Sequence, residues 1–172
     1  MTPEQLKPFC GTEEFRPYLK TPYSLGDYTY ATNANIIVRL PRMDGFSVDF
    51  DTADPRLVNA ADGSEKLFSE DFSAADLRPL TYGTLPPLGE KTCGECGTVH
   101  LAPDVSEYFV SVSLGAVFFS LKYIRLMQTL PSVCVPANPV PAKPMSFTFE
   151  GGEGLLIPLT MKSGSNHLDI EL

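Results

Sequence analysis

Two cysteines have the most specific spacing for chemistry in this chain. Cys93 and Cys96 enclose a Gly-Glu pair and are followed by another glycine. A Cys-x-x-Cys turn of this kind is typical of a zinc knuckle, because the glycines let backbone amides point at the thiolate sulfurs while both sulfurs face one ion. Zinc takes four tetrahedral ligands, and His100 is the candidate third ligand. The fourth would come from Cys10, from Cys134 or from the same pair in a second chain, which would assemble a dimer.

The same spacing also fits a tight hairpin with two free or oxidised thiols, left over from a lost metal site. A thioredoxin-like redox role is disfavoured, because that motif normally opens a helix after a strand, whereas residues 97–101 resemble a strand. The sequence does not decide between these two interpretations, the zinc site and the remnant hairpin. Outside a metal site, Cys10 and Cys134 are expected to be small buried apolar groups.

The remaining polar motifs do not form a catalytic set. His100 and His167 are the two histidines, and neither can be assigned to a Ser-His-Asp triad. The acidic residues of 49–54 lack the glycine and the closing glutamate of a calcium loop. The glycine-rich segment 150–154 has no lysine and precedes a strand instead of a helix, so phosphate binding is disfavoured. We therefore expect a protein that is not an enzyme.

Three basic residues form a candidate nucleic-acid surface. Lys122 and Arg125 are one helical turn apart on the polar side of a predicted helix, and Lys7 belongs to a first short helix. Three such charges predict weak, salt-sensitive binding, and the alternative is a solvated helix face. The net charge of −8 argues against general affinity for phosphate backbones.

Length and composition limit the kind of fold that can position these residues. A chain of 172 residues with 43% hydrophobic content fits one domain with a real core. It has no run of eighteen apolar residues and no apolar secretory segment near its first residues, so we expect a cytoplasmic protein that does not enter the membrane. Sixteen prolines and thirteen glycines indicate many loops and little long helix.

Segment 115–131 predicts a strand that leads directly into a helix. An apolar run at 116–119 is of strand type, and Ser120 is suited to the N-cap. From 121 to 130 apolar residues recur at three- and four-residue steps until Pro131 stops the helix, so this is the one long helix expected. A shorter helix is expected near residues 2–6.

The clearest β signals are two hairpins. Residues 27–40 alternate on either side of an Asn-rich turn, and residues 145–159 form two strands around a Gly-Gly turn. A short strand is expected at 133–135. Residues 43–105 are predicted to be an acidic, loop-rich insertion with helical turns near 54–60 and 73–77. The polar tail at 161–172 is expected to be flexible.

Three segments resemble the bacterial sliding clamp, the DNA polymerase III beta subunit. Residues 28–39 read YTYATNANIIVR and resemble the clamp hairpin "VATDGHRLA". Residues 119–131 read FSLKYIRLMQTLP, similar to its "FN-x-x-YL-x-x-x-L" helix. Residues 147–158 read FTFEGGEGLLIP, where the clamp has a final hairpin ending in "V-x-P". The same three blocks also resemble a group of uncharacterised phage and prophage proteins.

This chain departs from the clamp in two respects. A bacterial clamp has three such domains per chain and two chains per ring, whereas this chain has one. Asn33 and Asn35 replace an acidic and a basic residue of the clamp turn. The resemblance therefore implies an α+β, DNA-clamp-like single domain over 1–172. Its antiparallel sheet is expected to carry two short-to-medium helices on one side and the loop-rich insertion at about 43–105.

The expected function follows from the resemblance and from the lack of a catalytic set. We expect a non-enzymatic phage or prophage protein that engages host replication or defence proteins, through a protein partner or self-association. One alternative is a DNA-binding clamp-like accessory module that uses Lys7, Lys122 and Arg125. The other is a dimer assembled by zinc at Cys93, Cys96 and His100.

Overall fold

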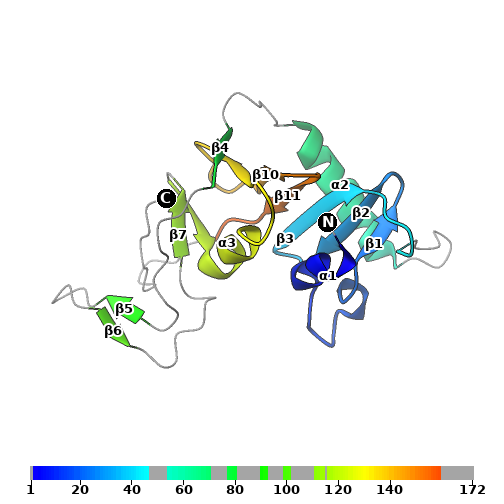
Figure 1. The fold of residues 1–172 in the computed structure, drawn as a ribbon, viewed down its shortest axis with the longest axis horizontal. Helices are drawn as coiled ribbons and strands as arrows, with labels where there is room; N and C mark the ends of the chain where they lie inside the picture. The colour runs from blue at the N-terminus through cyan, green and yellow to red at the C-terminus, as the bar shows by residue number, and fades with distance from the viewer. Residues whose placement is uncertain are drawn as a thin grey trace.

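The computed structural model describes residues 2–46, 54–70, 77–80, 90–92, 99–101, 111–114 and 116–159. Within these residues the main element is a seven-stranded antiparallel sheet in the order β1-β2-β3-β11-β10-β9-β4 (Figure 1). In that order the strands are Tyr23–Leu25, Tyr28–Thr32, Ile36–Pro41, Gly152–Leu156, Met145–Phe149, Cys134–Pro136 and Leu77–Pro79. The α+β class predicted from the sequence is confirmed.

Three α-helices accompany the sheet in the described part of the chain: α1 (Pro3–Leu6), α2 (Pro55–Glu70) and α3 (Leu121–Met127). Short 3-10 turns follow as η1 (Lys7–Phe9) and η2 (Pro17–Leu19). Two separate strand pairs are β5 (Glu90–Thr92) with β6 (Val99–Leu101), and β7 (Ser111–Leu114) with β8 (Val117–Ser120). None of the described helices has the length and apolar character needed to cross a membrane.

Both predicted hairpins form, and they pair with each other. β3 lies beside β11, with Ile36 opposite Leu156 and Val38 opposite Gly154. The turn between β2 and β3 is closed by Asn33, whose Oδ1 accepts hydrogen bonds from the amides of residues 35 and 36 at 3.0 and 3.2 Å. The left-handed position in this turn is occupied by Ala34 (φ 73°) and not by an asparagine.

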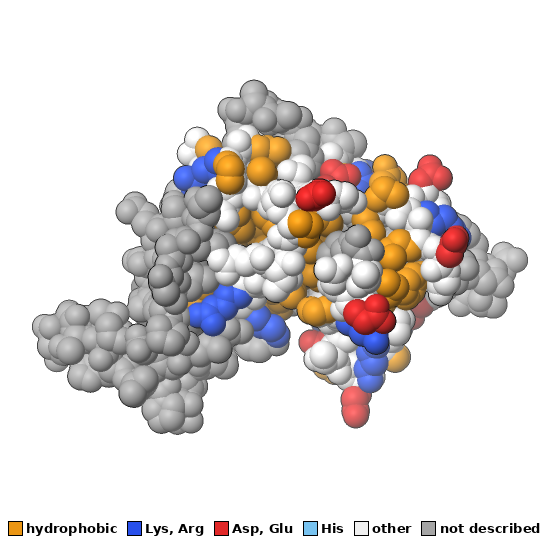
Figure 2. Space-filling view, viewed as in Figure 1, with side chains coloured by type: hydrophobic (Ala, Val, Ile, Leu, Met, Phe, Trp, Pro, Cys, Tyr) orange, Lys and Arg blue, Asp and Glu red, His pale blue; other side chains and the backbone are white. Residues whose placement is uncertain are grey.

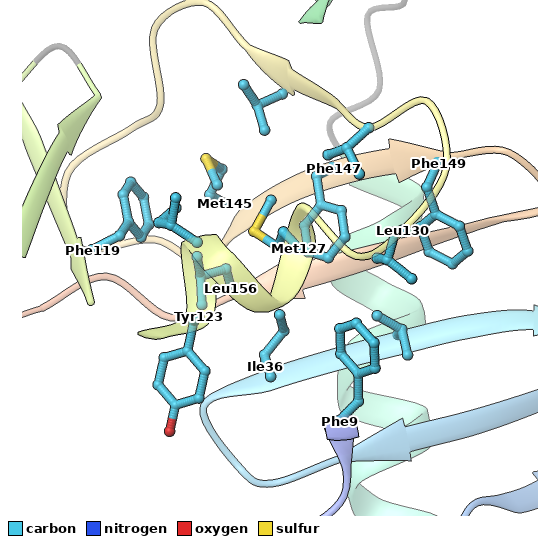
Figure 3. Packing of buried hydrophobic residues seen from close by; sticks show 14 of the residues in the cluster. Phe9, Ile36, Phe119, Tyr123, Met127, Leu130, Met145, Phe147, Phe149 and Leu156 are labelled. Atoms are coloured by element: carbon cyan, nitrogen blue, oxygen red, sulfur yellow. The ribbon is translucent and has the colours of Figure 1, made fainter. Parts of the chain in front are cut away.

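One face of the sheet carries the larger core, which is covered by α1, η1 and α3 (Figure 3). The predicted strand-to-helix unit is confirmed, with β8 ending at Ser120 and α3 beginning at Leu121, but α3 ends at Met127 and is shorter than the helix predicted to run to residue 130. The apolar side of α3 faces the sheet because its hydrophobic residues recur at helical spacing. Fully buried members of this core include Leu6, Phe9, Ile36, Phe119, Ile124, Met127, Phe147 and Leu156.

The opposite face carries a second, smaller core under α2. Leu57 and Ala61 of α2 pack with Tyr23 and Leu25 of β1 and with Tyr30 of β2. Successive residues of a strand point to opposite faces, so Tyr30 and its neighbour Ala31 belong to the two different cores. The sheet therefore has helices on both sides: α1 and α3 lie on one side, as the sequence predicted, but α2 covers the other side, which was not predicted.

The helix predicted near 54–60 in the insertion is confirmed in position, but it is much longer than predicted. The chain forms the 16-residue helix α2, which is the longest described helix. Its buried positions 57, 61, 64 and 68 follow a helical period, but two of them are Ala61 and Ser64, which weaken the apolar signal. Of the second predicted turn, residues 73–76 lie outside the described residues and Leu77 begins β4. The predicted tail at 161–172 also lies outside them.

The glycines of the 151–154 segment have two different roles. Gly151 turns the chain with φ 87°, as the sequence predicted for this hairpin. Gly152 and Gly154 instead lie under aromatic rings of the neighbouring strand: a Cβ at Gly154 would overlap the ring of Phe147, and one at Gly152 would overlap Phe149. Because these two positions of β11 are glycines, there is space for the two phenylalanine rings of the core.

We predict that Gly154→Ala destabilises the fold by about 1–3 kcal/mol, because the added methyl displaces a buried ring in a packed core. Gly63→Ala is the matched control, since Gly63 lies within α2 and nothing surrounds its Cβ position within 4 Å. Alanine is the better helix former there and should stabilise by about 0.5–1 kcal/mol. Urea denaturation measures both, and equal effects of the two substitutions would contradict the packing argument.

Candidate functional site

The predicted zinc ligands are only partly within the described residues. Cys93 and Cys96 lie outside them, and His100 is placed by its backbone alone, as the middle residue of β6 opposite Lys91. Within the described ranges, no three or more His, Cys, Asp or Glu side chains group closely enough to hold a metal ion. The zinc knuckle therefore stays a prediction.

The two cysteines suggested as a fourth ligand are in different places. Cys10 follows η1 and is buried in the larger core, where its thiol lies 3.8 Å from the carbonyl oxygen of Leu6. Burial raises the pKa of the Cys10 thiol to about 11, against a smaller opposing contribution from the backbone amide of Thr32. Cys134 lies half-buried on β9. Cys10 thus has the character of a small core residue, as the sequence suggested.

The three predicted nucleic-acid-binding residues come from elements on the same side of the sheet. Lys7 is exposed on η1, while Lys122 and Arg125 are half-buried on α3. The ammonium of Lys122 lies 5.7 Å from the Tyr123 ring, the Nε of Arg125 is buried, and both side chains have further contacts within the chain. Figure 2 shows basic side chains close to α3, with acidic and basic side chains mixed elsewhere on the face in view.

A polar cluster that the sequence did not predict lies under α2, centred on Arg39. Arg39 is the fourth residue of β3 and is 8% exposed. Its guanidinium carbon lies 4.4 Å from the ring centre of Tyr28 and 4.0 Å from that of Phe68. A cation placed against aromatic rings is attracted by their negative faces. Two elements, β2 and α2, thus contribute a ring to the same cation.

Two carboxylates complete the charge balance of this cluster. The Nε of Arg39 donates to Glu153 Oε1 at 2.7 Å, and Nη1 donates to Glu65 Oε1 at 2.9 Å. The Tyr30 hydroxyl donates to the same Glu65 oxygen at 2.8 Å. The cluster connects β2, β3, β11 and α2, and we call it the Arg39 network (Tyr28, Tyr30, Arg39, Glu65, Phe68 and Glu153).

The titration behaviour of the Arg39 network indicates a structural role. Burial acts to lower the pKa of Arg39, but its hydrogen bonds to Glu153 and the charge of Glu65 outweigh this and raise it. Burial and the hydrogen bond to Glu65 raise the pKa of Tyr30. Arg39 therefore stays charged and Tyr30 stays neutral at pH 7. Neither group is adjusted for proton transfer near neutral pH, which a general acid or base requires.

Sequence reasoning had one usable signal for this cluster. Arg39 interrupts an otherwise apolar strand, Ile-Ile-Val-Arg-Leu, and a charged residue at such a position is normally paired. Its partners were not predictable in the same way. Glu65 is one of many acidic residues in the insertion, and Glu153 lies between glycines in a segment read as a turn.

Comparison with known proteins does not identify the chain. No protein-family model matches it, and no curated protein or solved structure matches it either. A functional proposal therefore rests on the residues of this chain and on how they pack.

We predict that Tyr30→Phe lowers the free energy of unfolding by about 1 kcal/mol, because it removes the hydroxyl that donates to the half-exposed Glu65. Tyr23→Phe is the matched control. Tyr23 stacks on Tyr30 with ring centres 5.5 Å apart, but its buried hydroxyl has no hydrogen-bond partner among the described residues. Removing that hydroxyl should be neutral or slightly stabilising. Urea midpoints at equal m-values measure both, and an equal loss in the two variants would contradict the network.

We predict that Cys10 resists alkylation in the folded protein. At pH 8 a thiol with a pKa of about 11 is about one-thousandth thiolate, against about one-tenth for the ordinary value of 9.0. Iodoacetamide labelling followed by peptide mass spectrometry should therefore show Cys10 reacting at least about 100-fold more slowly than the same residue in urea. Comparable rates in the folded and unfolded chain would contradict its burial.

The raised pKa of Cys10 also makes the stability of the folded protein depend on pH. Because the pKa of Cys10 is higher in the folded chain than in the unfolded one, the folded state holds this proton more tightly. Its contribution to stability is complete below pH 9 and is lost as the pH rises towards about 11. The raised pKa values of Tyr23 and Tyr30 act in the same direction. Thermal melts across this range should therefore show falling stability.

Proposed function

We propose that this chain is a single-domain, sliding-clamp-like interaction module of phage or prophage origin that engages a host replication or defence protein and catalyses no reaction. The observation that carries the proposal is the meeting of the three clamp-like segments. The β2–β3 and β10–β11 hairpins share one sheet through the pairing of β3 with β11, and α3 packs against the same face. This shared sheet and core support the proposal.

The ionisable groups with displaced pKa values fit a non-enzymatic role. Arg39 and Tyr30 belong to the Arg39 network, and Cys10 is a buried core thiol. Asp54 has its pKa lowered to about 2 by hydrogen bonds from Arg56, which lies beside it at the start of α2. Each of these groups makes contacts within the fold, either between two elements or within one element.

The DNA-binding alternative has less support. α1, η1 and α3 do lie on one side of the sheet, as the helices of a clamp would. However, the Nε of Arg125 is buried, so this guanidinium cannot present all its donors to a phosphate. The net charge of −8 further opposes binding to a polyanion. A protein partner is therefore the better fit.

We expect the folded chain to capture a replication or defence protein from a bacterial host extract, whereas a core-disrupted bait does not. Phe147→Ala is the matched bait, because it removes a fully buried ring at a cost of about 3–5 kcal/mol and leaves the surface composition unchanged. Quantitative mass spectrometry compares the two captures. Recovery of no such protein by the wild-type chain would refute the proposal.

A gel-shift titration at low salt separates the DNA alternative from this proposal. We expect no shift at micromolar protein. If Lys7, Lys122 and Arg125 instead contact phosphates, log K should fall with log salt at a slope of about −2.7, and the triple alanine variant should abolish the shift.

A further inference from the structure

The segment from Gly11 to Leu19 forms a closed loop with a fixed neck. The amide of Gly11 donates to the carbonyl of Leu19 at 2.9 Å, and Leu19 is buried. A Cβ at Gly11 would lie 3.1 Å from the Cβ of Leu19, so the two chain segments at the neck of the loop are in contact. Turns inside the loop are closed by further backbone bonds, from Arg16 to Glu13 and from Leu19 to Arg16. In Figure 1 this blue segment after α1 extends away from the sheet.

The tip of this loop presents an aromatic ring to solvent. Phe15 is 72% exposed, the highest value for a large hydrophobic residue in the described part of the chain. Pro17 beside it is exposed, whereas Tyr18 packs against the smaller core, so the apolar surface of the tip is that of Phe15 and Pro17. The neck and turns hold the backbone in place, so little conformational freedom remains to be lost on binding at this tip.

The charges on either side of Phe15 have opposite signs. Glu14 precedes the ring and is exposed, while Arg16 follows it with its guanidinium 5.2 Å from the ring centre. A two-fold axis through such a tip would place each acid opposite the base of the other copy. An aromatic centre flanked by one negative and one positive group is therefore complementary to itself.

We propose that two copies of this chain associate through the Phe15 tip, with the two Phe15 rings in contact and Glu14 of each copy opposite Arg16 of the other. Two loop tips bury far less than the ~1,200 Å² of a stable interface, so the dimer is weak, with a Kd of about 0.1–1 mM. This association does not depend on the proposed host partner.

Sedimentation equilibrium of the full chain at about 20 µM to 1 mM tests the dimer. The average mass of the wild-type chain should rise towards that of a dimer, and Phe15→Ala should weaken association at least about tenfold. Glu14→Arg and Arg16→Glu should each weaken it, because like charges then face each other across the axis. The double variant E14R/R16E should restore it. Ile157→Ala, which removes another exposed apolar side chain, should leave it unchanged.

Thermal melts confirm that each variant is folded before its mass is interpreted. A wild-type chain that stays monomeric up to about 1 mM would overturn the proposal. Association that survives Phe15→Ala, that the double variant fails to restore, or that continues beyond a dimer would also overturn it. Capture of a host protein by the monomeric chain would then leave the proposed function standing without this contact.

Discussion

The pairing of Arg39 with Glu153 joins the two halves of the seven-stranded sheet. The two residues lie directly opposite each other on β3 and β11, although 114 positions separate them in the chain. Their backbones join the N-terminal and C-terminal hairpins into one sheet, and their side chains form the ion pair that α2 covers. Removing one member of such a partly buried pair leaves the other without its partner, which costs more than the pair itself contributes. The two residues thus lie where the two hairpins pair, and Arg39 also connects this pairing to Glu65 of α2.

The two sides of the sheet are stabilised by different chemistry. On the side of α1 and α3 the packing is apolar and aromatic, and it includes the rings of Phe147 and Phe149 above the glycines of β11. On the side of α2 a smaller apolar cluster adjoins the Arg39 network. Burial of apolar area stabilises the first side without directional preference, whereas the hydrogen bonds that Arg39 and Tyr30 donate to Glu65 of α2 are directional. These contacts connect α2, a helix with Gly63 and several polar residues, to the sheet.

The sequence predicted the elements with strong periodicity and missed those whose signal comes from tertiary contacts. Both hairpins and the strand-to-helix unit over 115–131 were predictable, because alternation and turn residues agree locally, although the helix ends at Met127 and not next to Pro131. The length of α2 was not predictable, since Ala61 and Ser64 occupy two of its four buried positions and dilute the apolar stripe. The Arg39 network was missed because its three charged members are distant in the chain, and their pairing depends on a strand order that no local pattern gives. The Cys-x-x-Cys spacing of Cys93 and Cys96 is a local motif, so it was the easiest candidate site to identify from the sequence. Both residues lie outside the described residues, and the zinc site stays a prediction.

The distribution of charge limits how this chain can engage a partner. Arg39 and Arg56 are both used internally, the first with Glu65 and Glu153 and the second with Asp54. Cations committed to intramolecular pairs contribute little to an electrostatic surface for a polyanion, and the excess of acidic groups opposes such a surface further. Specific contacts then have to come from shape and apolar groups placed on a fixed backbone. The loop that carries Phe15 has these properties, because its neck is closed by backbone hydrogen bonds and by the anchored side chain of Leu19. For the partner proposed above, rigid presentation of a few side chains is therefore a better basis for contact than overall charge.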